Sequence, residues 1–382
     1  MSTFWLTLAA VCLILYVALS LTFLFYPNLI HKPKRIPRSQ QVIAHRGAPQ
    51  HHLQARSPRV NTCEIMSTFW LTLAVVCLIL YVALSLTFLF YPNLIHKPKR
   101  IPRSQQVIAH RGGAGECLEN TEEAFDNSVK VGATILEMDV RLTRDGKVVV
   151  FHDVKLQRAC GDNRRISECH YKDLPQLKKT IPVTFYKGKE TTGKDRHITL
   201  LRKVFERFPD VLMNIDIKEN NEVLINKVID MIEEFEREKI TILASSNDNV
   251  VKRCCQKDDK VLLAFGKWGV MMVLLAFYTG LLPFLRLRED VFEIIMPSLC
   301  FRMFTPQPDD GWLQKKWFPP LFDMLLMNRL LFRHLKARGI EVYIFVLNQE
   351  EDVNRALRYG VTNIMTDYPS WLVEFYKKIF SH

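Results

Sequence analysis

The sequence predicts an α/β protein, a TIM (β/α)8 barrel preceded by an N-terminal transmembrane anchor. Three observations lead to this fold class. Short apolar runs alternate with amphipathic stretches from Gln105 onward, as strands alternate with helices in a parallel sheet. That region holds about 277 residues, close to the roughly 250 of a typical TIM barrel. A charge-free apolar run precedes it and is long enough to cross a bilayer.

Nine apolar runs are strand candidates, one more than a barrel of eight requires, and the sequence does not tell which one is extra. They cover residues 106–110, 135–141, 147–152, 212–218, 240–245, 261–265, 292–297, 342–347 and 361–366. The helix candidates cover residues 119–131, 200–208, 222–238, 247–256, 321–338, 350–359 and 370–379.

Residues 1–47 and 66–112 are two copies of one sequence that differ only at Ala10 and Val75. Real repeat folds show degenerate similarity over many copies, so we expect a recent exon duplication or a gene-model error, with Met66 as the functional start. The predicted organisation is a duplicated anchor segment and spacer at 1–65, an anchor with a basic linker at 66–104, and the barrel at 105–382.

The run at 69–91 carries no charge over about 23 residues and is expected to be an uncleaved anchor. A cleaved signal peptide would have a shorter apolar region and a small-residue cleavage site. Basic residues follow the run, so the positive-inside rule predicts that the barrel faces the cytosol. The expected membrane is the endoplasmic reticulum or another internal membrane. These residues are Lys97, Lys99, Arg100 and Arg103. If the first copy is also present, a helical hairpin is the alternative.

A second apolar stretch, residues 268–287, interrupts the alternation and contains Gly280 and Pro283. We expect an apolar, membrane-facing insert, either a dipping loop or a half-buried helix. A second transmembrane span is the alternative. It is disfavoured because one crossing here would separate the last two strand candidates from the first.

Composition narrows the expected partners. The net charge is +12, but no Lys/Arg run with interleaved aromatic residues is present, so nucleic acid is not expected as a partner. Basic residues beside the apolar segments suit anionic lipid headgroups of a bilayer. The nine cysteines show no C-x-x-C spacing, which predicts reduced thiols and no zinc site. Nothing in the sequence indicates a protein partner.

Carboxylates at alternate strand positions are the first chemical signal. Glu137 and Asp139 project from the same side of their strand, and Asp216 projects with Lys218. Inward carboxylates in a barrel are costly unless they are paired or bound to a metal, so three of them suggest a divalent cation. Oxygen ligands favour Mg²⁺ or Ca²⁺ over zinc. A salt-bridged pair on an exposed edge strand is the alternative for Glu137 and Asp139.

Histidines at strand ends are the second signal. His110 and His152 each close a strand candidate near these carboxylates. Taken alone, His110 is more typical of a hydrogen-bonded core histidine. Residues 143–146 are an ordinary hairpin turn, and residues 119–121 are a helix cap. The combination and its order carry the functional interpretation.

That ordered combination resembles the glycerophosphodiester phosphodiesterase family. The motifs are HRG at 110–112, ENT at 119–121, ExD at 137–139, TRDG at 143–146, FHD at 151–153, NIDIK at 214–218 and MTDYP at 365–369. The resemblance covers the chain from about Gln105 to its end. With its anchor and apolar insert, the sequence is most similar to the small membrane-bound vertebrate branch that acts as lysophospholipase D.

The resemblance implies a metal-dependent phosphodiesterase with one divalent cation, Mg²⁺ or Ca²⁺. Many family members have Glu where this chain has Asp216, and many have Trp where it has Phe345. The implied site residues are the general acid and base His110 and His152, the metal-binding Glu137, Asp139 and Asp216, the phosphate-binding Arg111 and Lys218, and the pocket-lining Phe345.

The implied reaction is hydrolysis of a lysophospholipid to lysophosphatidate and a headgroup alcohol, with the insert guiding the acyl chain. The substrate's own free hydroxyl would attack first, giving a cyclic phosphate that water opens. The alternatives are release of glycerol 3-phosphate from soluble glycerophosphodiesters, or an inactive lipid-binding barrel. His45, the first-copy counterpart of His110, lacks the downstream motifs and is expected to have no catalytic role.

Overall fold

The computed structural model describes residues 62–99, 106–304 and 318–380. The first sequence copy, His45 and most of the spacer lie outside the described residues, as do Arg100 and Arg103. The chain divides into two units, Met1–Phe88 and Leu89–His382. Helix α2, Thr62–Phe90, begins in the first unit, and its segment Phe69–Phe90 is long and apolar enough to cross a bilayer.

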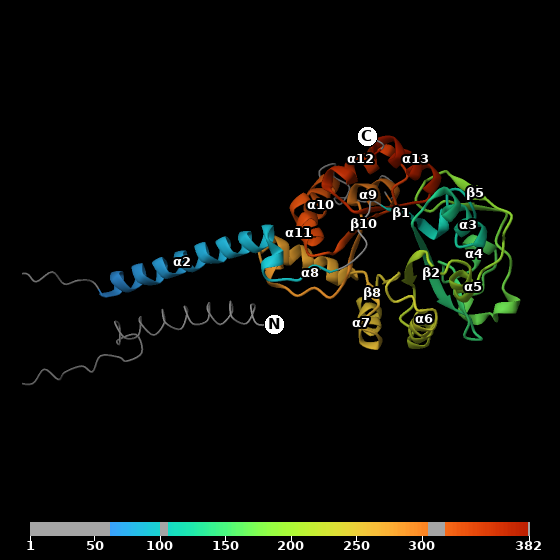
Figure 1. Ribbon diagram of the computed structural model, residues 1–382, viewed down its shortest axis with the longest axis horizontal. Coiled ribbons are helices and arrows are strands. Elements are labelled where there is room, and N and C mark those ends of the chain that lie inside the picture. The colour runs from blue at the N-terminus through green and yellow to red at the C-terminus, as the bar shows by residue number, and fades with distance from the viewer. Residues whose placement is uncertain (1–61, 100–105, 305–317, 381–382) are drawn as a thin grey trace, which may run out of the picture. The chain divides into compact units, whose positions relative to one another are not determined.

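Eight parallel strands form the barrel, as the sequence predicted (Figure 1). Their order around the ring is β1, β2, β6, β7, β8, β9, β10 and β11. A bridge between Ala264 and Val291 closes the ring between β8 and β9. The strands are β1 Gln106–Ala109, β2 Ile135–Leu142, β6 Leu212–Ile217, β7 Thr241–Ala244, β8 Leu262–Leu263, β9 Val291–Ile295, β10 Glu341–Phe345 and β11 Asn363–Thr366.

The extra strand candidate is β3, Val148–Val150, which pairs antiparallel with the end of β2 and lies off the ring. It forms a hairpin with β2 through the turn at residues 143–146, and Gly146 has a φ of 71° there. The long β2 loop also carries the two-stranded sheet of β4, Thr180–Pro182, and β5, Glu190–Thr192. A separate apolar cluster that includes Leu118, Phe151 and Leu156 stabilises this loop.

Helices surround the barrel and connect its strands. The sequence predicted one helix at 321–338, but these residues form two helices. The break occurs because the Asn328 side chain accepts hydrogen bonds from Leu330 N and Leu331 N and starts a new helix. The helices are α3 Glu122–Val131, α4 Gln157–Cys160, α5 Leu201–Arg207, α6 Glu222–Glu234, α7 Asp248–Lys257, α8 Lys267–Tyr278, α9 Pro297–Phe304, α10 Phe318–Leu326, α11 Arg329–Ala337, α12 Glu350–Tyr359 and α13 Pro369–Phe380. Short 3-10 turns are η2 Pro92–Leu94, η3 His110–Gly112, η4 Ile166–Glu168, η5 Tyr171–Asp173 and η6 Leu282–Phe284.

Strand alternation separates two kinds of side chain. Outward residues such as Leu136, Met138 and Ile215 pack in the large core between strands and helices. Inward residues are apolar near the start of the strands, where Ile108 and Ile135 belong to a smaller inner cluster. Farther along, the inward positions become charged. The polar end of the barrel is therefore the carboxyl end of the strands, where TIM-barrel active sites lie.

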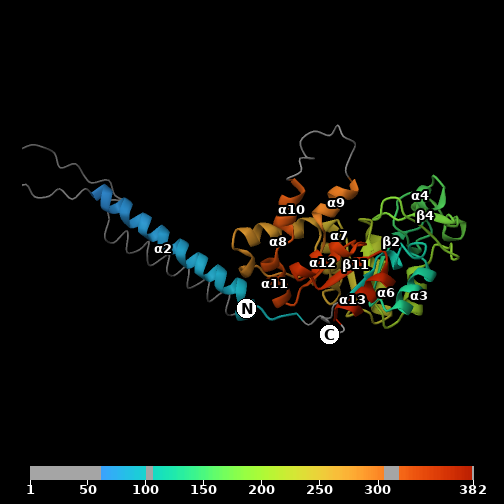
Figure 2. The same ribbon diagram turned by 90° about the horizontal axis from the view of Figure 1, so that it is seen from above.

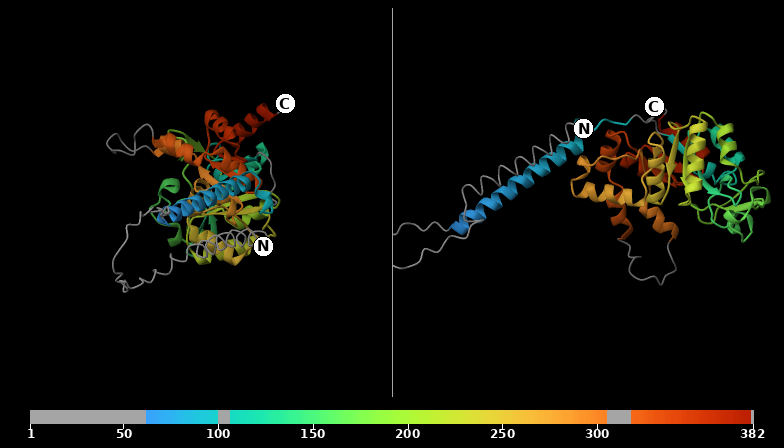
Figure 3. Two further views of the ribbon diagram at one scale, coloured as in Figure 1. Left: turned by 90° about the vertical axis from the view of Figure 1, so that its left-hand side faces the viewer. Right: turned by 90° about the horizontal axis from the view of Figure 1, so that it is seen from below.

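The loop after β2 and the helices after β9 face each other across the carboxyl end of the barrel. β2 and β9 are four strands apart in a ring of eight, so the loop after β2 and the helices after β9 lie on opposite sides. The loop after β2, in green, and helices α9 and α10, in orange, accordingly lie on opposite sides of the barrel (Figures 2 and 3).

Candidate functional site

Three carboxylates project into the barrel mouth from two neighbouring strands, as the spacing predicted. Glu137 and Asp139 project from β2, and Asp216 projects from the neighbouring strand β6. Parallel register pairs Asp139 directly with Asp216. Glu137 and Asp139 are almost fully buried. The carboxylates therefore lie on neighbouring strands inside the barrel. This excludes the alternative that Glu137 and Asp139 are a salt-bridged pair on an exposed edge strand.

Two basic residues hold this cluster together. Lys218 Nζ lies 2.8 Å from Asp139 Oδ1 and 2.5 Å from Asp216 Oδ2. Arg111 Nε lies 3.2 Å from Asp139 Oδ2, and the Arg111 backbone N–H donates to Glu137 Oε2 at 2.7 Å. Both residues expected to contact phosphate thus lie within the carboxylate cluster.

The cluster is electrostatically unbalanced. Burial, reinforced by Asp139, raises the pKa of Glu137 well above its ordinary value. Burial would also raise the pKa of Asp139, but Lys218 and Arg111 outweigh it and hold that pKa far below its ordinary value. Burial raises the pKa of Asp216 despite the opposing charge of Lys218. Two cations therefore compensate Asp139 well and leave Glu137 and Asp216 under-compensated.

The donor chemistry fits an oxygen-binding cation. Asp216 Oδ1 is buried and accepts no hydrogen bond, although a buried carboxylate oxygen normally has a partner. Together with the raised pKa of Glu137, this leaves unused acceptor capacity at the mouth. Within the ranges that the structure describes, no three His, Cys, Asp or Glu side chains converge as metal ligands, and Lys218 Nζ lies between the two aspartates.

His110 is fixed by an aspartate that directly follows the last strand of the barrel. Its Nδ1 lies 2.6 Å from Oδ1 of the buried Asp367, and Asn348 Nδ2 donates to Asp367 Oδ2 at 2.7 Å. The HRG turn needs its glycine, because Gly112 has a φ of 76° and a Cβ there would lie 2.8 Å from Phe125 Cδ1. Burial lowers the pKa of His110, although Asp367 opposes this shift. The neutral imidazole is therefore favoured.

His152 has a matching partner. Its Nδ1 lies 2.6 Å from Asp153 Oδ1, and Arg158 Nε donates to Asp153 Oδ2 at 2.7 Å. Arg158 also pairs with Glu119, which in turn pairs with Arg111. Burial opposes ionisation of Asp153, but His152 and Arg158 hold its pKa far below the ordinary value. Asp139 interacts electrostatically with both histidines, so the two His–Asp pairs flank one carboxylate cluster.

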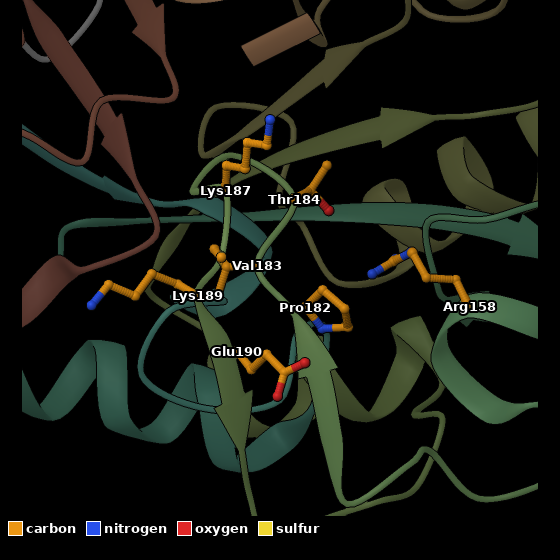
Figure 4. Close-up of a pocket in the computed structure, with 8 residues that line it drawn as sticks. Arg158, Pro182, Val183, Thr184, Lys187, Lys189 and Glu190 are labelled. Carbon is orange, nitrogen blue, oxygen red and sulfur yellow. The ribbon is translucent and has the colours of Figure 1, made fainter. Parts of the chain in front are cut away.

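The loop between β4 and β5 extends over His110. The ring of Phe185 packs edge-on against His110 with centroids 5.3 Å apart, and the Phe185 carbonyl accepts from Asn348 Nδ2. Beside it lies a cavity of about 490 Å³, with Arg158 and Lys189 on opposite sides of the loop and Lys187 near its tip (Figure 4). Its lining residues are Arg158, Pro182, Val183, Thr184, Lys187, Gly188, Lys189 and Glu190. Phe345, half-buried at the end of β10, packs on the inner apolar cluster.

Several members of this network received no role from the sequence. Asp367 and Glu119 lie in motifs of the family resemblance, but no function was assigned to either, and Arg158 was not considered. In the structure, Asp367 binds His110 directly, and Arg158 binds both Asp153 and Glu119. Glu293 also faces the mouth from β9, accepts from Asn214 Nδ2 at 2.8 Å, and burial raises its pKa to about 7. A glutamate between apolar neighbours in a buried strand was the available signal for Glu293.

A family model decides the relationship. The glycerophosphoryl diester phosphodiesterase family model matches residues 110–370. The chain belongs to this family. Lysophospholipase D GDPD1 of Homo sapiens is 43% identical over 295 residues, covering 77% of this chain and 93% of that protein. Lysophospholipase D GDPD3 of Mus musculus is 38% identical over 304 residues, covering 78% and 90%.

The fold is shared with solved structures of the family. A glycerophosphoryl diester phosphodiesterase domain from Mycobacterium tuberculosis matches with a TM-score of 0.54 at 14% identity, covering 71% of this chain and 99% of that domain. The predicted family and barrel are therefore confirmed, whereas the roles of individual site residues stay predictions.

Proposed function

We propose that this chain is a membrane-anchored lysophospholipase D that releases lysophosphatidate and a headgroup alcohol. The observation that carries the proposal is the pair of histidines, each bound through Nδ1 to an aspartate at 2.6 Å beside one carboxylate cluster. The names of relatives at 38–43% identity support the substrate class. Intact His–Asp pairs and a complete carboxylate set argue against an inactive lipid-binding barrel.

His110 is proposed as the first general base. When Nδ1 donates its proton to Asp367, Nε2 is left as an acceptor for a substrate hydroxyl. The lowered pKa of His110 keeps it in this neutral form. The substrate's free glycerol hydroxyl loses its proton to Nε2 while its oxygen attacks phosphorus.

His152 is proposed as the general acid. The bond from phosphorus to the headgroup oxygen breaks as a new phosphorus–oxygen bond forms, and the leaving alkoxide takes a proton from His152. The Asp153 carboxylate stabilises the positively charged imidazole that makes this transfer feasible. Water then opens the cyclic phosphate with the two proton transfers reversed. A diacyl lipid has no free hydroxyl, which accounts for a lyso preference.

Glu137, Asp139 and Asp216 are proposed to hold one Mg²⁺ or Ca²⁺, which would polarise the phosphoryl oxygens and offset their charge. Lys218 would turn from the aspartates toward the phosphate once a cation compensates them, and Arg111 would add positive charge from beneath. Phe345 would line the wall of the pocket. None of these residues needs to leave the barrel mouth to do so.

The membrane placement is part of the proposal. The segment Phe69–Phe90 would anchor the chain, and the positive-inside rule applied to Lys97 and Lys99 after it favours a barrel on the cytosolic side of an internal membrane. The insert at 268–287 would guide a single acyl chain toward the mouth. Soluble glycerophosphodiesters, cleaved to glycerol 3-phosphate, are the second candidate substrates because they carry the same neighbouring hydroxyl.

The test is to incubate the purified chain in vesicles with lysophosphatidylcholine and with glycerophosphocholine, with and without EDTA, and to identify the products. We expect lysophosphatidate and choline from the lysolipid, loss of this activity with EDTA, and recovery with Mg²⁺ or Ca²⁺. Cleavage of glycerophosphocholine alone would favour the second candidate. Recovery with Zn²⁺ alone would contradict the oxygen-ligand argument.

A further inference from the structure

Helix α8 exposes an apolar face that the barrel does not cover. Val273 and Ala276 are buried against the core, whereas Trp268 is 71% exposed and Met271, Met272 and Leu275 are each more than half exposed. The helix has 12 residues and so extends about 18 Å, well short of the roughly 30 Å hydrocarbon core of a bilayer. It is too short to span a membrane and too apolar to suit water.

The exposed apolar surface continues onto two more helices. The Tyr278 hydroxyl at the end of α8 donates to the Leu325 carbonyl of α10 at 2.7 Å. α10 also exposes Phe322 and Met324, and α11 exposes Leu330. The three helices gather on the same side of the barrel in both views (Figures 1 and 2). One apolar face therefore belongs to elements separated by about 50 residues in the chain.

The end of α2 is bound at the same place. His334 Nδ1 on α11 lies 2.9 Å from the Leu89 carbonyl, and the Arg333 guanidinium lies 5.7 Å from the centre of the Phe90 ring. The linker that follows is bound as well, because His96 Nε2 lies 2.7 Å from the Pro283 carbonyl. If α2 spans a bilayer, the residues that contact Leu89 and Phe90 lie at the bilayer surface.

Charge indicates what kind of surface this is. Lys267, Arg286, Arg329 and Arg333 are exposed on or beside the three helices. Asp323 of α10 is buried and pairs with Arg355, so it does not offset them. Exposed apolar side chains bordered by basic ones match the chemistry of an anionic leaflet.

We propose that the exposed face of α8, α10 and α11 rests in the interfacial layer of an anionic leaflet, the same leaflet from which α2 emerges. The proposal rests on the membrane anchoring proposed above and adds a second, non-spanning attachment. Trp268 lies at the level of the lipid carbonyls, and Arg286 and Arg329 contact lipid phosphates. The barrel is therefore held at two places rather than by a single tether.

Trp268 provides the test. The full chain is placed in vesicles of phosphatidylcholine with phosphatidylserine, and the emission of Trp268 is taken as the difference between wild type and Trp268→Phe. We expect blue-shifted emission that is quenched more strongly by lipids brominated near the carbonyl end of the acyl chain than by lipids brominated near its tip. Stronger quenching from the tip would mean a deeply inserted span and would overturn the proposal.

The role of the basic residues is tested by comparing two double variants. Arg286→Gln with Arg329→Gln should reduce the quenching by at least about threefold in vesicles containing phosphatidylserine, while the control Lys172→Gln with Lys203→Gln, on exposed positions elsewhere, should not. If the chain floats with the vesicles but Trp268 is not quenched, the second attachment is refuted, whereas the proposed anchor helix stands. In that case crosslinking between copies would identify a protein–protein face instead. Failure of the chain to float would refute both proposals, and none of these readouts depends on activity.

Discussion

Replacing Asp367 by Asn should abolish the base function of His110 without emptying the space beside it. The amide can keep the bond from Asn348 Nδ2 only by accepting with its oxygen, which turns its own N–H toward His110 Nδ1. His110 must then accept at Nδ1 and carry its proton on Nε2. The nitrogen that faces the substrate becomes a donor, so it cannot take the proton of the attacking hydroxyl.

The size of the loss follows from what a general base contributes. A positioned base accelerates proton transfer by about 10²–10⁴-fold, or about 2.7–5.4 kcal/mol in the activation free energy. We expect kcat on lysophosphatidylcholine to fall by that factor with KM changing by less than about threefold. The acid limb of the pH–rate profile of any remaining activity should move to lower pH. The reason is that Asp367 raises the pKa of His110 and the neutral amide does not.

The matched control is Asp290→Asn. Asp290 is also a buried barrel carboxylate, but it lies at the start of β9, where it accepts from Lys99 and from Leu263 N. This variant should lower the melting temperature and leave kcat within about threefold of wild type. Thermal denaturation confirms folding of both proteins. An Asp367→Asn enzyme with near-wild-type kcat would refute the assignment of His110 as the base.

Three further predictions concern other parts of the chain. His152→Ala should lower kcat by at least about 10²-fold on lysophosphatidylcholine. The loss should be much smaller on a substrate whose leaving alcohol has a low pKa, since that alcohol departs without a general acid. Asp216→Asn should weaken Mg²⁺ or Ca²⁺ binding in calorimetry while shifting the melting temperature little; unchanged affinity would remove it from the ligand set. Burial lowers the pKa of His334 to about 4, so the unfolded chain takes up a proton below about pH 6.5 and the folded chain does not. Stability should therefore fall by up to about 3 kcal/mol from pH 7 to 4, and His334→Gln should flatten this profile in denaturant titrations.

The sequence predicted those features that depend on the local pattern of apolar and polar residues. Alternation placed Glu137, Asp139 and Asp216 on inward positions because a strand presents every second residue to one side. It could not distinguish β3 from a barrel strand, because a run of three valines suits either position. The break before α11 was also hidden, because a single capping Asn328 lies between two apolar helical stretches.

The site was harder to predict where its partners are distant in the chain. Asp367 is 257 residues from His110, and only closure of the barrel brings β11 beside β1. The same limit applies to Arg158, whose double role with Asp153 and Glu119 depends on how the long β2 loop folds back. Motif resemblance predicted which groups react, and these roles stay predictions, whereas the residues that orient the histidines became visible only in the folded structure.

The bound linker after α2 has a kinetic consequence. A barrel on a loose tether would sample substrate in bulk water, but Lys99 Nζ is hydrogen-bonded to the carbonyl of Glu289 and pairs with Asp290, and His96 is bound to the Pro283 carbonyl. With its linker bound in this way, the enzyme would search for lysolipid in two dimensions. Its rate should then depend on the mole fraction of lysolipid in the membrane and fall when inert phospholipid dilutes it at constant bulk concentration.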